Sequence, residues 1–426
     1  MNYEDLIVKL SEVPYIRIRK QSKHHDSIDF FWNATGKTEL YTLSPQTKEI
    51  RQTTFGELST PWCIRSLDPN ILYFGKDVKG NEQFASYQLN LQTKNVHQLS
   101  SSLSFNEGPS DISPDGRFLL LLSKRSGQYN LFKMDLTTQN VTQITDQKNP
   151  FRGYAFWSVN DWIYYNSNET DNRRNRDIWA VRPDGSDNHL LYRYSPDSQE
   201  WLLDLSKDGH YLVVETNGKK TKQGGVLNLV TNEIIWFGKE HYDEDPKELS
   251  RDNSKLLTIR FQGLERIPVI YDVHTGEEHV LNVRGVVREG AFCLNDEYIV
   301  YSRTDPKTPE SLMLYNLTTD EEELVLAPEL GISKEQFIDG QAITYPSFDD
   351  WAIPAVLYKP KLAKGERAPA LLFHPGGPGG HLSLLFLPIL QIFSQLGFVV
   401  LGPSPRGSTG LGKEYFEGNV LDLGGG

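Results

Sequence analysis

The sequence predicts two fold classes in succession: an all-β repeat array over residues 20–330, then the first part of an α/β domain over residues 331–426. The first prediction rests on short apolar strands and polar turns that recur about every 45 residues, the period of a four-stranded repeat. The second rests on two apolar strands that flank a segment of helical length near residue 390. Residues 1–19 precede the array and fit one amphipathic helix that ends at Pro14.

The repeat is defined by a turn that begins with Asn or Asp, continues with Leu or Val, and has Thr in its fourth place. Such turns begin at Asn90, Asp135, Asn228, Asp272 and Asn316. Degenerate copies at residues 43–47 and 181–185 fill the gaps. Asn, Asp and Thr suit a turn because their side chains satisfy its backbone groups. Counting the turns predicts a seven-bladed β-propeller, with six or eight blades as alternatives because two copies are degenerate.

A second turn precedes the strongest apolar strand of several repeats. It reads Ser-x-Asp-Gly at Ser113 and Ser206, and Ser-x-Asp-Asn at Ser250. Asp-Gly between two apolar runs is typical of a hairpin. The array should therefore supply a channel and a surface. The basic stretch at residues 173–176 is expected to be a solvated loop.

Composition excludes several classes of function. The net charge of −12 argues against binding to a nucleic-acid backbone. Two distant cysteines, Cys63 and Cys293, cannot build a disulfide framework and are expected to be free thiols. His24, His25 and residues 241–245 include metal-ligand types, but no second cluster follows at a fixed spacing, so no metal or cofactor is predicted.

The N-terminus carries acids where a signal peptide would carry a cationic segment, and no apolar run reaches the length of a membrane span. We therefore expect a reducing, cytoplasmic setting and no membrane partner.

The α/β segment is organised around a glycine-rich loop at residues 374–380. A strand at residues 369–373 precedes the loop, and a helix at 384–396 and a strand at 398–401 follow it. The loop thus lies at the carboxyl end of a strand, where open α/β sheets bind their substrates. Upstream, residues 342–360 predict two strands around a turn at Asp349 and Asp350.

The glycine loop suits the stabilisation of an oxyanion. In an α/β-hydrolase, a loop after an early strand provides one backbone N–H of the oxyanion hole. Gly376 and Gly377, beside His374, are the natural donors because a backbone without side chains allows close approach. The alternative is a glycine-rich loop without function. Residues 407–414 approach a phosphate-binding loop, but Glu414 replaces the Mg²⁺-binding Ser or Thr, which argues against a nucleotide.

Three motifs together resemble the prolyl oligopeptidase family of serine peptidases, nearest its acylaminoacyl-peptidase-like branch. They are the Pro354–Pro360 stretch, the Gly-Gly-Pro sequence at 376–378, and the Pro-Arg-Gly-Ser-Thr-Gly-Leu-Gly sequence at 405–412. The resemblance implies hydrolysis of short peptides by a Ser-Asp-His triad, with a propeller that limits access by large substrates. It also marks Arg406, Gly407 and Ser408 as a family-motif loop.

The sequence departs from the family in two places. Pro375, rather than His, precedes Gly-Gly-Pro. No Gly-x-Ser-x-Gly elbow occurs in these 426 residues, so none of Ser383, Ser394, Ser404 and Ser408 is assigned as nucleophile. We expect the N-terminal portion of a serine oligopeptidase that is inactive alone, because the triad would lie beyond Gly426.

Alternatives stay open at this point. The chain could be a propeller used as a binding module with a vestigial hydrolase start, or a fragment completed by a separate C-terminal chain; a homo-oligomer is also open. The strands at 371–373 and 398–401 should present apolar surface and an unpaired edge when no further strands cover them.

Overall fold

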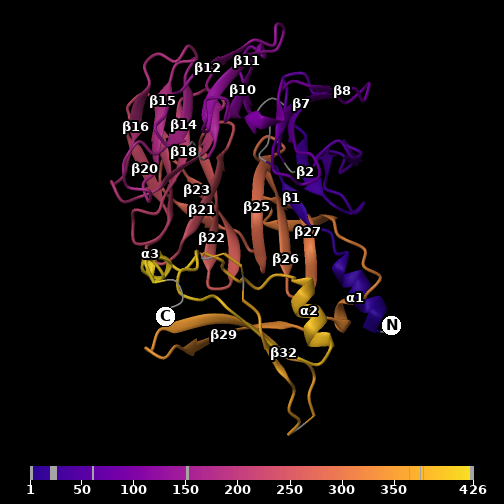
Figure 1. Ribbon diagram of the computed structural model, residues 1–426. Coiled ribbons are helices and arrows are strands. Elements are labelled where there is room, and N and C mark those ends of the chain that lie inside the picture. The colour runs from indigo at the N-terminus through magenta and orange to yellow at the C-terminus, as the bar shows by residue number, and fades with distance from the viewer. Residues whose placement is uncertain are drawn as a thin grey trace.

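The computed structural model describes residues 3–19, 26–59, 62–149, 153–363, 365–374, 376–377 and 379–422. Its larger part is a succession of antiparallel sheets, drawn from indigo to orange in Figure 1. Its smaller part is a mixed sheet with helices, which lies below the larger part in the same view. His24, His25, Pro375 and Pro378 fall outside the described residues.

Each repeat forms four antiparallel strands that pair in chain order. The first sheet has β1 (Ile16–Ile18), β2 (Ile28–Trp32), β3 (Glu39–Leu43) and β4 (Ile50–Gln52). The second has β5 (Cys63–Arg65), β6 (Ile71–Lys76), β7 (Ala85–Asn90) and β8 (Val96–Gln98). The third has β9 (Gly108–Ile112), β10 (Phe118–Ser123), β11 (Asn130–Asp135) and β12 (Val141–Gln143), preceded by a short 3₁₀ turn at Leu103–Phe105.

The later repeats follow the same order. They are β13 (Ala155–Trp157) to β16 (His189–Tyr192), with β14 (Ile163–Ser167) and β15 (Asp177–Val181) between them, and then β17 (Glu200–Leu205), β18 (Tyr211–Thr216), β19 (Gln223–Asn228) and β20 (Ile234–Phe237). The last two are β21 (Glu244–Leu249), β22 (Lys255–Gln262), β23 (Glu265–Asp272) and β24 (Glu278–Val280), then β25 (Val286–Cys293), β26 (Tyr298–Asp305), β27 (Thr308–Asn316) and β28 (Glu321–Leu326). One parallel pair, Arg266 with Val286, joins these two into an eight-stranded sheet.

The repeated turns form as their residue types predict. At Asn90, the side-chain oxygen accepts the backbone N–H groups of Gln92 and Thr93, at 3.0 and 2.9 Å. The same two bonds recur at Asp135, Asn228, Asp272 and Asn316. Each turn then needs one residue with positive φ, such as Lys94 at 61°. The turn therefore links the third and fourth strands of a sheet by local hydrogen bonds alone.

The Ser-x-Asp turns connect first and second strands. The Ser113 hydroxyl donates to Asp115 (2.6 Å) and accepts the N–H of Phe118 (2.8 Å), and Gly116 takes a φ of 71°. Equivalent bonds form at Ser206 and Ser250. The hairpins predicted at the Asp-Gly turns after Ser113 and Ser206 are confirmed.

Consecutive sheets pack through clusters of buried apolar side chains. Leu40 of β3 and Phe74 of β6 meet in the cluster between the first two sheets. Phe30 of β2 meets Leu312 and Leu314 of β27 in the cluster that joins the first sheet to the last. The succession of sheets is therefore circular, and burial of these faces supplies most of the stabilising apolar contact.

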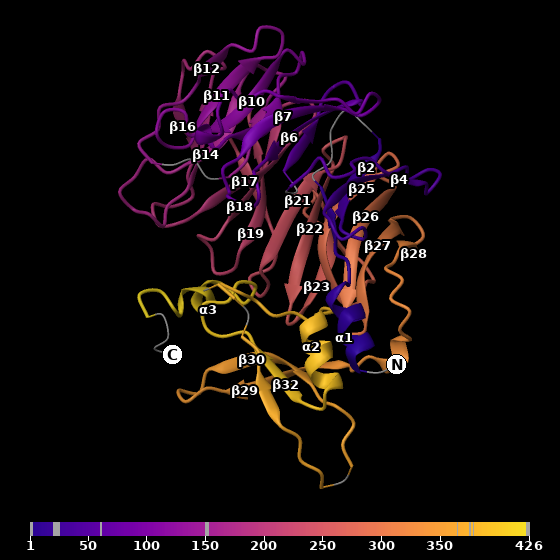
Figure 2. The same cartoon turned by 45° about the vertical axis from the view of Figure 1, so that its right-hand side comes forward.

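The smaller part contains α1 (Tyr3–Ser11), a 3₁₀ turn (Lys334–Gln336), β29 (Gly340–Pro346), β30 (Ala352–Tyr358), β31 (Ala370–Leu372), α2 (Pro388–Gln395), β32 (Val399–Pro403) and α3 (Lys413–Glu417). The sheet order is β29-β30-β32-β31, with β31 parallel to β32. In Figures 1 and 2, α1 lies beside α2, and buried Leu10 and Phe386 belong to one apolar cluster there. Among the described helices, none is long and apolar enough to cross a bilayer.

The helix predicted over 384–396 begins later, at Pro388. Backbone amides just before it are bonded to the larger part instead. Leu384 donates to the carbonyl of Leu264 (2.8 Å), and Phe386 donates to the Thr304 hydroxyl (3.0 Å). Proline at the first helical position then needs no hydrogen-bond acceptor.

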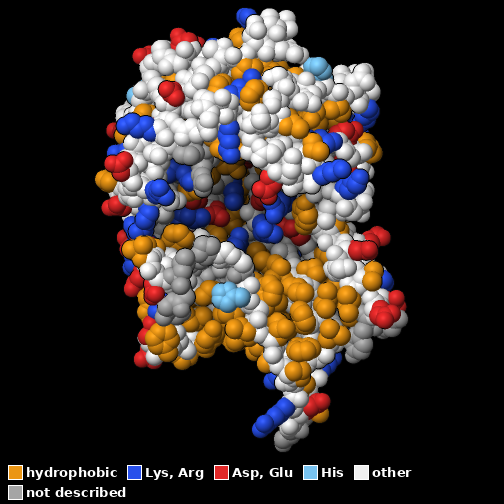
Figure 3. All heavy atoms as spheres, in the orientation of Figure 1, with side chains coloured by type: hydrophobic (Ala, Val, Ile, Leu, Met, Phe, Trp, Pro, Cys, Tyr) orange, Lys and Arg blue, Asp and Glu red, His pale blue; other side chains and the backbone are white. Residues whose placement is uncertain are grey.

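Apolar side chains remain uncovered on the smaller part. Leu372 of β31 is 64% exposed, and Ile389 and Leu396 near α2 are 39% exposed. Figure 3 shows hydrophobic side chains gathered over the lower half of the molecule around α2, whereas charged side chains line the hollow above. The expected apolar surface is therefore present: no residue of β31 is buried, whereas Val400, Gly402 and Pro403 of β32 are.

Glu200, at the start of β17, illustrates the cost of a buried carboxyl group. It is fully buried and accepts hydrogen bonds from Ser198 (2.6 Å) and Thr216 (2.9 Å). Burial raises its pKa to about 7 from an ordinary 4.5. The folded protein thus holds a proton that the unfolded chain releases, so this group lowers stability as the pH rises from 4.5 to about 7.

Glu200→Gln is therefore expected to raise the free energy of unfolding at pH 8 by roughly 1–3 kcal/mol relative to wild type, with a much smaller gain near pH 5. Urea unfolding at both pH values measures the difference. The exposed Glu233→Gln is the matched control and should change stability equally little at both. An equal effect of Glu200→Gln at the two pH values would contradict the burial argument.

Candidate functional site

The glycine loop follows β31 at the surface. His374, Gly376 and Gly377 are exposed, and Gly377 has a φ of 75°. A Cβ at Gly376 or Gly377 would meet no atom within 4 Å, so the space above the loop is open. Within the described ranges, neither glycine amide donates a hydrogen bond. Two backbone donors are therefore available to a ligand at the carboxyl end of a parallel strand.

The family-motif loop is hydrogen-bonded to the backbone at the end of the glycine loop. The buried Ser408 hydroxyl lies 2.8 Å from the carbonyl oxygen of Gly380 and 2.7 Å from that of Pro405. The N–H of Thr409 donates to the carbonyl of Gly379 (3.2 Å). Ser408 thus positions the neighbouring backbone and is not placed as a nucleophile.

Contacts with neighbouring side chains also hold Arg406 and Gly407 in place. Arg406 donates to Asp349 (2.6 Å), and its guanidinium lies over the rings of Phe348 and Trp351. Although desolvation opposes it, the bond from Arg406 lowers the pKa of Asp349. Gly407 has a φ of 93°, and a Cβ there would lie 1.9 Å from the Asn419 side chain. The motif loop is therefore anchored to the β29–β30 turn.

The other serines are equally unsuited to attack. Ser394 donates to a carbonyl of its own helix, Ser404 accepts the N–H of Leu382, and the Ser383 hydroxyl is buried. None of these hydroxyls bonds to a histidine in the described part of the chain. Cys63 and Cys293 are free and buried, as expected, and burial raises their pKa values to about 11 and about 12. Both thiols stay protonated and poorly nucleophilic.

The motif loop also docks on the sheets. Gly412 donates to the Asp243 carboxylate (3.1 Å), and Lys413 donates to the carbonyl of Lys220 (2.9 Å). A carboxylate therefore already faces the start of α3, which agrees with the argument against a phosphate. Gly410 lies on the Phe261 ring, at the end of β22.

Gly410→Ala should weaken this docking. A Cβ at Gly410 would lie 2.3 Å from Cδ1 of Phe261, and its φ is 84°. Gly365 has the same φ of 84° with no neighbour within 4 Å, so Gly365→Ala isolates the backbone cost. We expect the strained backbone to lower the free energy of unfolding by about 1–2 kcal/mol at both sites. The overlap with Phe261 should lower it by about a further 1–3 kcal/mol at Gly410. Equal losses of stability for the two variants in thermal unfolding would show that the contact between Gly410 and Phe261 does not stabilise the protein.

Sequence reasoning missed a group of side chains at this docking surface. His381 follows the glycine loop and meets the Phe261 ring edge-on, with centroids 5.8 Å apart. Arg266, at the start of β23, lies over the same ring at 4.4 Å. The positive charge of Arg266 acts on the His381 ring. The one available signal was a histidine directly after Gly379 and Gly380.

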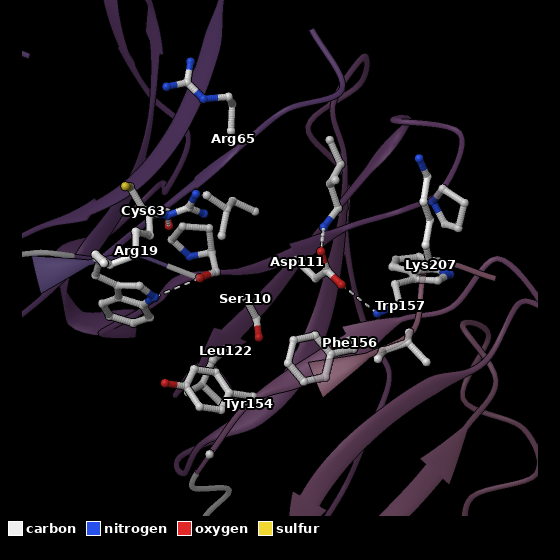
Figure 4. A pocket seen from close by; sticks show the side chains of 18 of the residues that line it. Arg19, Cys63, Arg65, Ser110, Asp111, Leu122, Tyr154, Phe156, Trp157 and Lys207 are labelled. Carbon is white, nitrogen blue, oxygen red and sulfur yellow. Dashed lines mark hydrogen bonds between the residues drawn. The ribbon is translucent and has the colours of Figure 1, made fainter. Parts of the chain in front are cut away.

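A cavity of about 550 Å³ lies among the first strands of the sheets. Its lining includes Arg19, Cys63, Asp111, Tyr154 and Glu289. In Figure 4, the Asp111 carboxylate accepts the backbone N–H of Trp157 (2.8 Å), which links two sheets across the cavity wall. Among the described residues, no group of three metal-ligand side chains gathers here or elsewhere. The lining combines these polar groups with aromatic and aliphatic side chains such as Phe31, Trp62 and Leu122.

Comparison with known proteins shows what the chain is similar to. No family model matches it. A prolyl endopeptidase of Elizabethkingia meningoseptica is 29% identical over 120 residues, which is 28% of this chain and 17% of that protein. An uncharacterised peptidase of Bacillus subtilis is 26% identical over 31% of this chain and 20% of its own length. Dipeptidyl-peptidase 5 of Schizosaccharomyces pombe is 26% identical over 35% of this chain and 21% of its own length.

Solved structures extend the likeness to the fold. A prolyl endopeptidase structure matches with a TM-score of 0.80 at 13% identity, over 98% of this chain and 65% of that one. A puromycin-hydrolysing peptidase of Mycobacterium tuberculosis matches with a TM-score of 0.77 at 14% identity, over 97% and 69%. Prolyl oligopeptidase B of Galerina marginata matches with a TM-score of 0.71 at 15% identity, over 98% and 66%.

The chain thus spans about two thirds of the structures it matches, and the sequence matches cover about a fifth of the curated relatives. The circular, propeller-like arrangement of sheets and the following mixed sheet agree with these neighbours. The chain is thus similar in sequence, over about a third of its length, to proteins named as peptidases, and it shares the fold of prolyl oligopeptidase structures over nearly its whole length.

Proposed function

We propose that this chain is the propeller-bearing N-terminal portion of a serine oligopeptidase, built from a seven-bladed β-propeller and the first strands of an α/β-hydrolase domain. The seven four-stranded repeats and the apolar cluster between the first and last support the propeller. The parallel pair β31–β32 with α2 between them supports the hydrolase start. The substrate class is short peptides.

One observation carries this proposal: Gly376 and Gly377 present open backbone donors beside the propeller. Such donors stabilise the oxyanion of acyl transfer by several kcal/mol when a nucleophile is also present. Without a Gly-x-Ser-x-Gly elbow, the chain can bind a peptide carbonyl but cannot form an acyl intermediate. The chain alone should therefore bind short peptides without cleaving them.

The second candidate is a propeller that acts only as a binding module, which the cavity of about 550 Å³ favours. Fluorescence polarisation with labelled pentapeptides and a labelled folded protein separates the two. Saturable binding of the short peptides alone supports the oligopeptidase proposal. Tight binding of the folded protein, with no binding of short peptides, supports the binding module and contradicts the first proposal.

A further inference from the structure

Arg266 lies in the hydrolase-facing hairpin of the sixth repeat. Its backbone N–H donates to the carbonyl of Gly285 (3.1 Å), which fixes the start of β23. Its guanidinium stacks on Phe261 at 4.4 Å, so the ring covers one of its flat faces and the N–H groups point along the guanidinium plane, away from the ring. The same hairpin accepts the N–H of Leu384 at the carbonyl of Leu264, which ties Arg266 to the segment behind the glycine loop.

The Arg266 guanidinium has no anionic partner among the described residues. Its Nε atom is buried and makes no hydrogen bond. By contrast, Arg65 is paired with Asp29 at 2.6 Å and Arg260 with Glu244 at 2.7 Å. A charge that is largely removed from water without a counter-charge costs several kcal/mol, so a guanidinium in this state indicates a binding role.

The acid that acts electrostatically on Arg266 is shared with a lysine. Asp245 acts on Arg266, but Lys222 forms an ion pair with Asp245 and also lies 3.3 Å from Glu215. Arg288 adds a second positive charge. Asp245 is therefore only partly available to Arg266, and a ligand carboxylate at the guanidinium would add the charge-assisted hydrogen bonds that Asp245 does not make.

His381 supplies a second donor. Both of its ring nitrogens are buried, and the Thr409 backbone is the one hydrogen-bonding group that acts on the ring among the described residues. Burial and the charge of Arg266 lower its pKa to about 4, so the ring is neutral at pH 7 and offers one N–H. The residue directly follows Gly380, whose carbonyl is held by Ser408. The donor is thus fixed next to the glycine loop.

We propose that the Arg266 guanidinium edge binds a carboxylate of the peptide ligand, with His381 as an additional donor. The inference rests on the proposed function, because it names which peptides the glycine-loop site prefers. A guanidinium edge matches the two oxygens of a carboxylate in bidentate geometry. The carboxylate can be the C-terminus of a short peptide or an acidic side chain.

The test measures binding of three labelled pentapeptides to the 426-residue chain. One has a free C-terminus, one is its C-terminal amide, and one is that amide with a glutamate introduced. The free acid should bind at least about ten-fold more tightly than the amide, as expected for a charge-assisted pair. A gain by the glutamate peptide assigns recognition to side chains, and its absence assigns it to the terminus.

Arg266→Met should remove the preference for the carboxylate, Arg266→Lys should retain part of it, and the exposed Arg284→Met should leave it intact. His381→Gln should reduce it by a smaller factor. Because the Arg266 charge is uncompensated, Arg266→Met should not lower the unfolding midpoint. Equal affinity of wild type for acid and amide, or a preference that survives Arg266→Met, overturns this inference alone. Failure of all three peptides to bind overturns the proposed function instead.

Discussion

Replacing Arg260 by methionine is expected to lower the free energy of unfolding by about 3–5 kcal/mol. Arg260 donates to Glu244 (2.7 Å), to Glu278 (2.5 Å) and to the Tyr271 hydroxyl (2.7 Å). The side chains of Arg260 and Glu244 are only 4% and 1% exposed. Removing the guanidinium leaves Glu244 as a buried carboxylate without its counter-charge, and the lost solvation is not restored.

Urea unfolding compares this variant with Lys48→Met, which breaks the exposed Lys48–Glu323 pair between the first and last repeats. The control should cost less than about 1 kcal/mol, because exposed pairs are screened by water. The double variant Arg260→Met/Glu244→Met should recover most of the lost stability. A cost for Arg260→Met no larger than that of Lys48→Met would refute the role given to this buried pair.

The second large effect concerns hydrogen exchange in β31. Its backbone pairs only with β32 among the described strands, and Leu372 is 64% exposed. In β27, by contrast, both neighbours are paired and Leu312 is fully buried. Local opening of an edge strand with few buried contacts needs far less free energy than global unfolding. Amides of β31 should exchange at least about 100-fold faster than those of β27.

Exposed apolar residues on this edge should also promote association at high concentration. Leu372→Lys is expected to reduce light scattering without slowing exchange in β31, because it adds a charge and no hydrogen bond. Val230→Lys, at a turn residue that is 75% exposed in the propeller-like part, is the matched control and should change neither property. Equal protection of β31 and β27 would show that the smaller part is as stable as the sheets.

The repeats were predictable because their turns are local. The Asn90 side chain bonds amides two and three residues ahead, and Gly116 supplies a positive φ within the same turn. Each pattern therefore carries its structure within five residues, and the period followed directly. The start of α2 was not predictable, because the amides of Leu384 and Phe386 bond to groups far away in the sequence.

In the candidate site, too, the features formed by neighbouring residues were predictable and those formed by distant residues were not. The glycine loop could be found from residue types, because open backbone after a strand is a local property. The cluster of Arg266, Phe261 and His381 could not, because its members come from two separate parts of the chain. The basic stretch at 173–176 shows the same limit. Arg173 and Arg174 are exposed, as expected of a solvated loop, and Arg174 pairs with Glu417 at 2.6 Å. Only Arg176 departs from the expectation, because it stacks on Trp201 at 3.3 Å.

The structural results combine into one account of the site. The motif loop fixes the glycine loop through Ser408 and Thr409, and His381, which follows that loop, contacts Phe261 of the propeller-like sheets. In the function that we propose, this arrangement serves peptide binding and oxyanion stabilisation, whereas none of Ser383, Ser394, Ser404 and Ser408 is placed as a nucleophile. A chain of this kind should recognise peptides and leave their bonds intact.

The most direct measurement combines turnover with covalent labelling. The purified chain is incubated with chromogenic acyl-amino-acid and aminoacyl substrates, then with a fluorophosphonate, and its intact mass is recorded. The account predicts no turnover above background and no phosphonylated serine. Turnover that the fluorophosphonate abolishes, together with a single adduct on one serine of this chain, would contradict it.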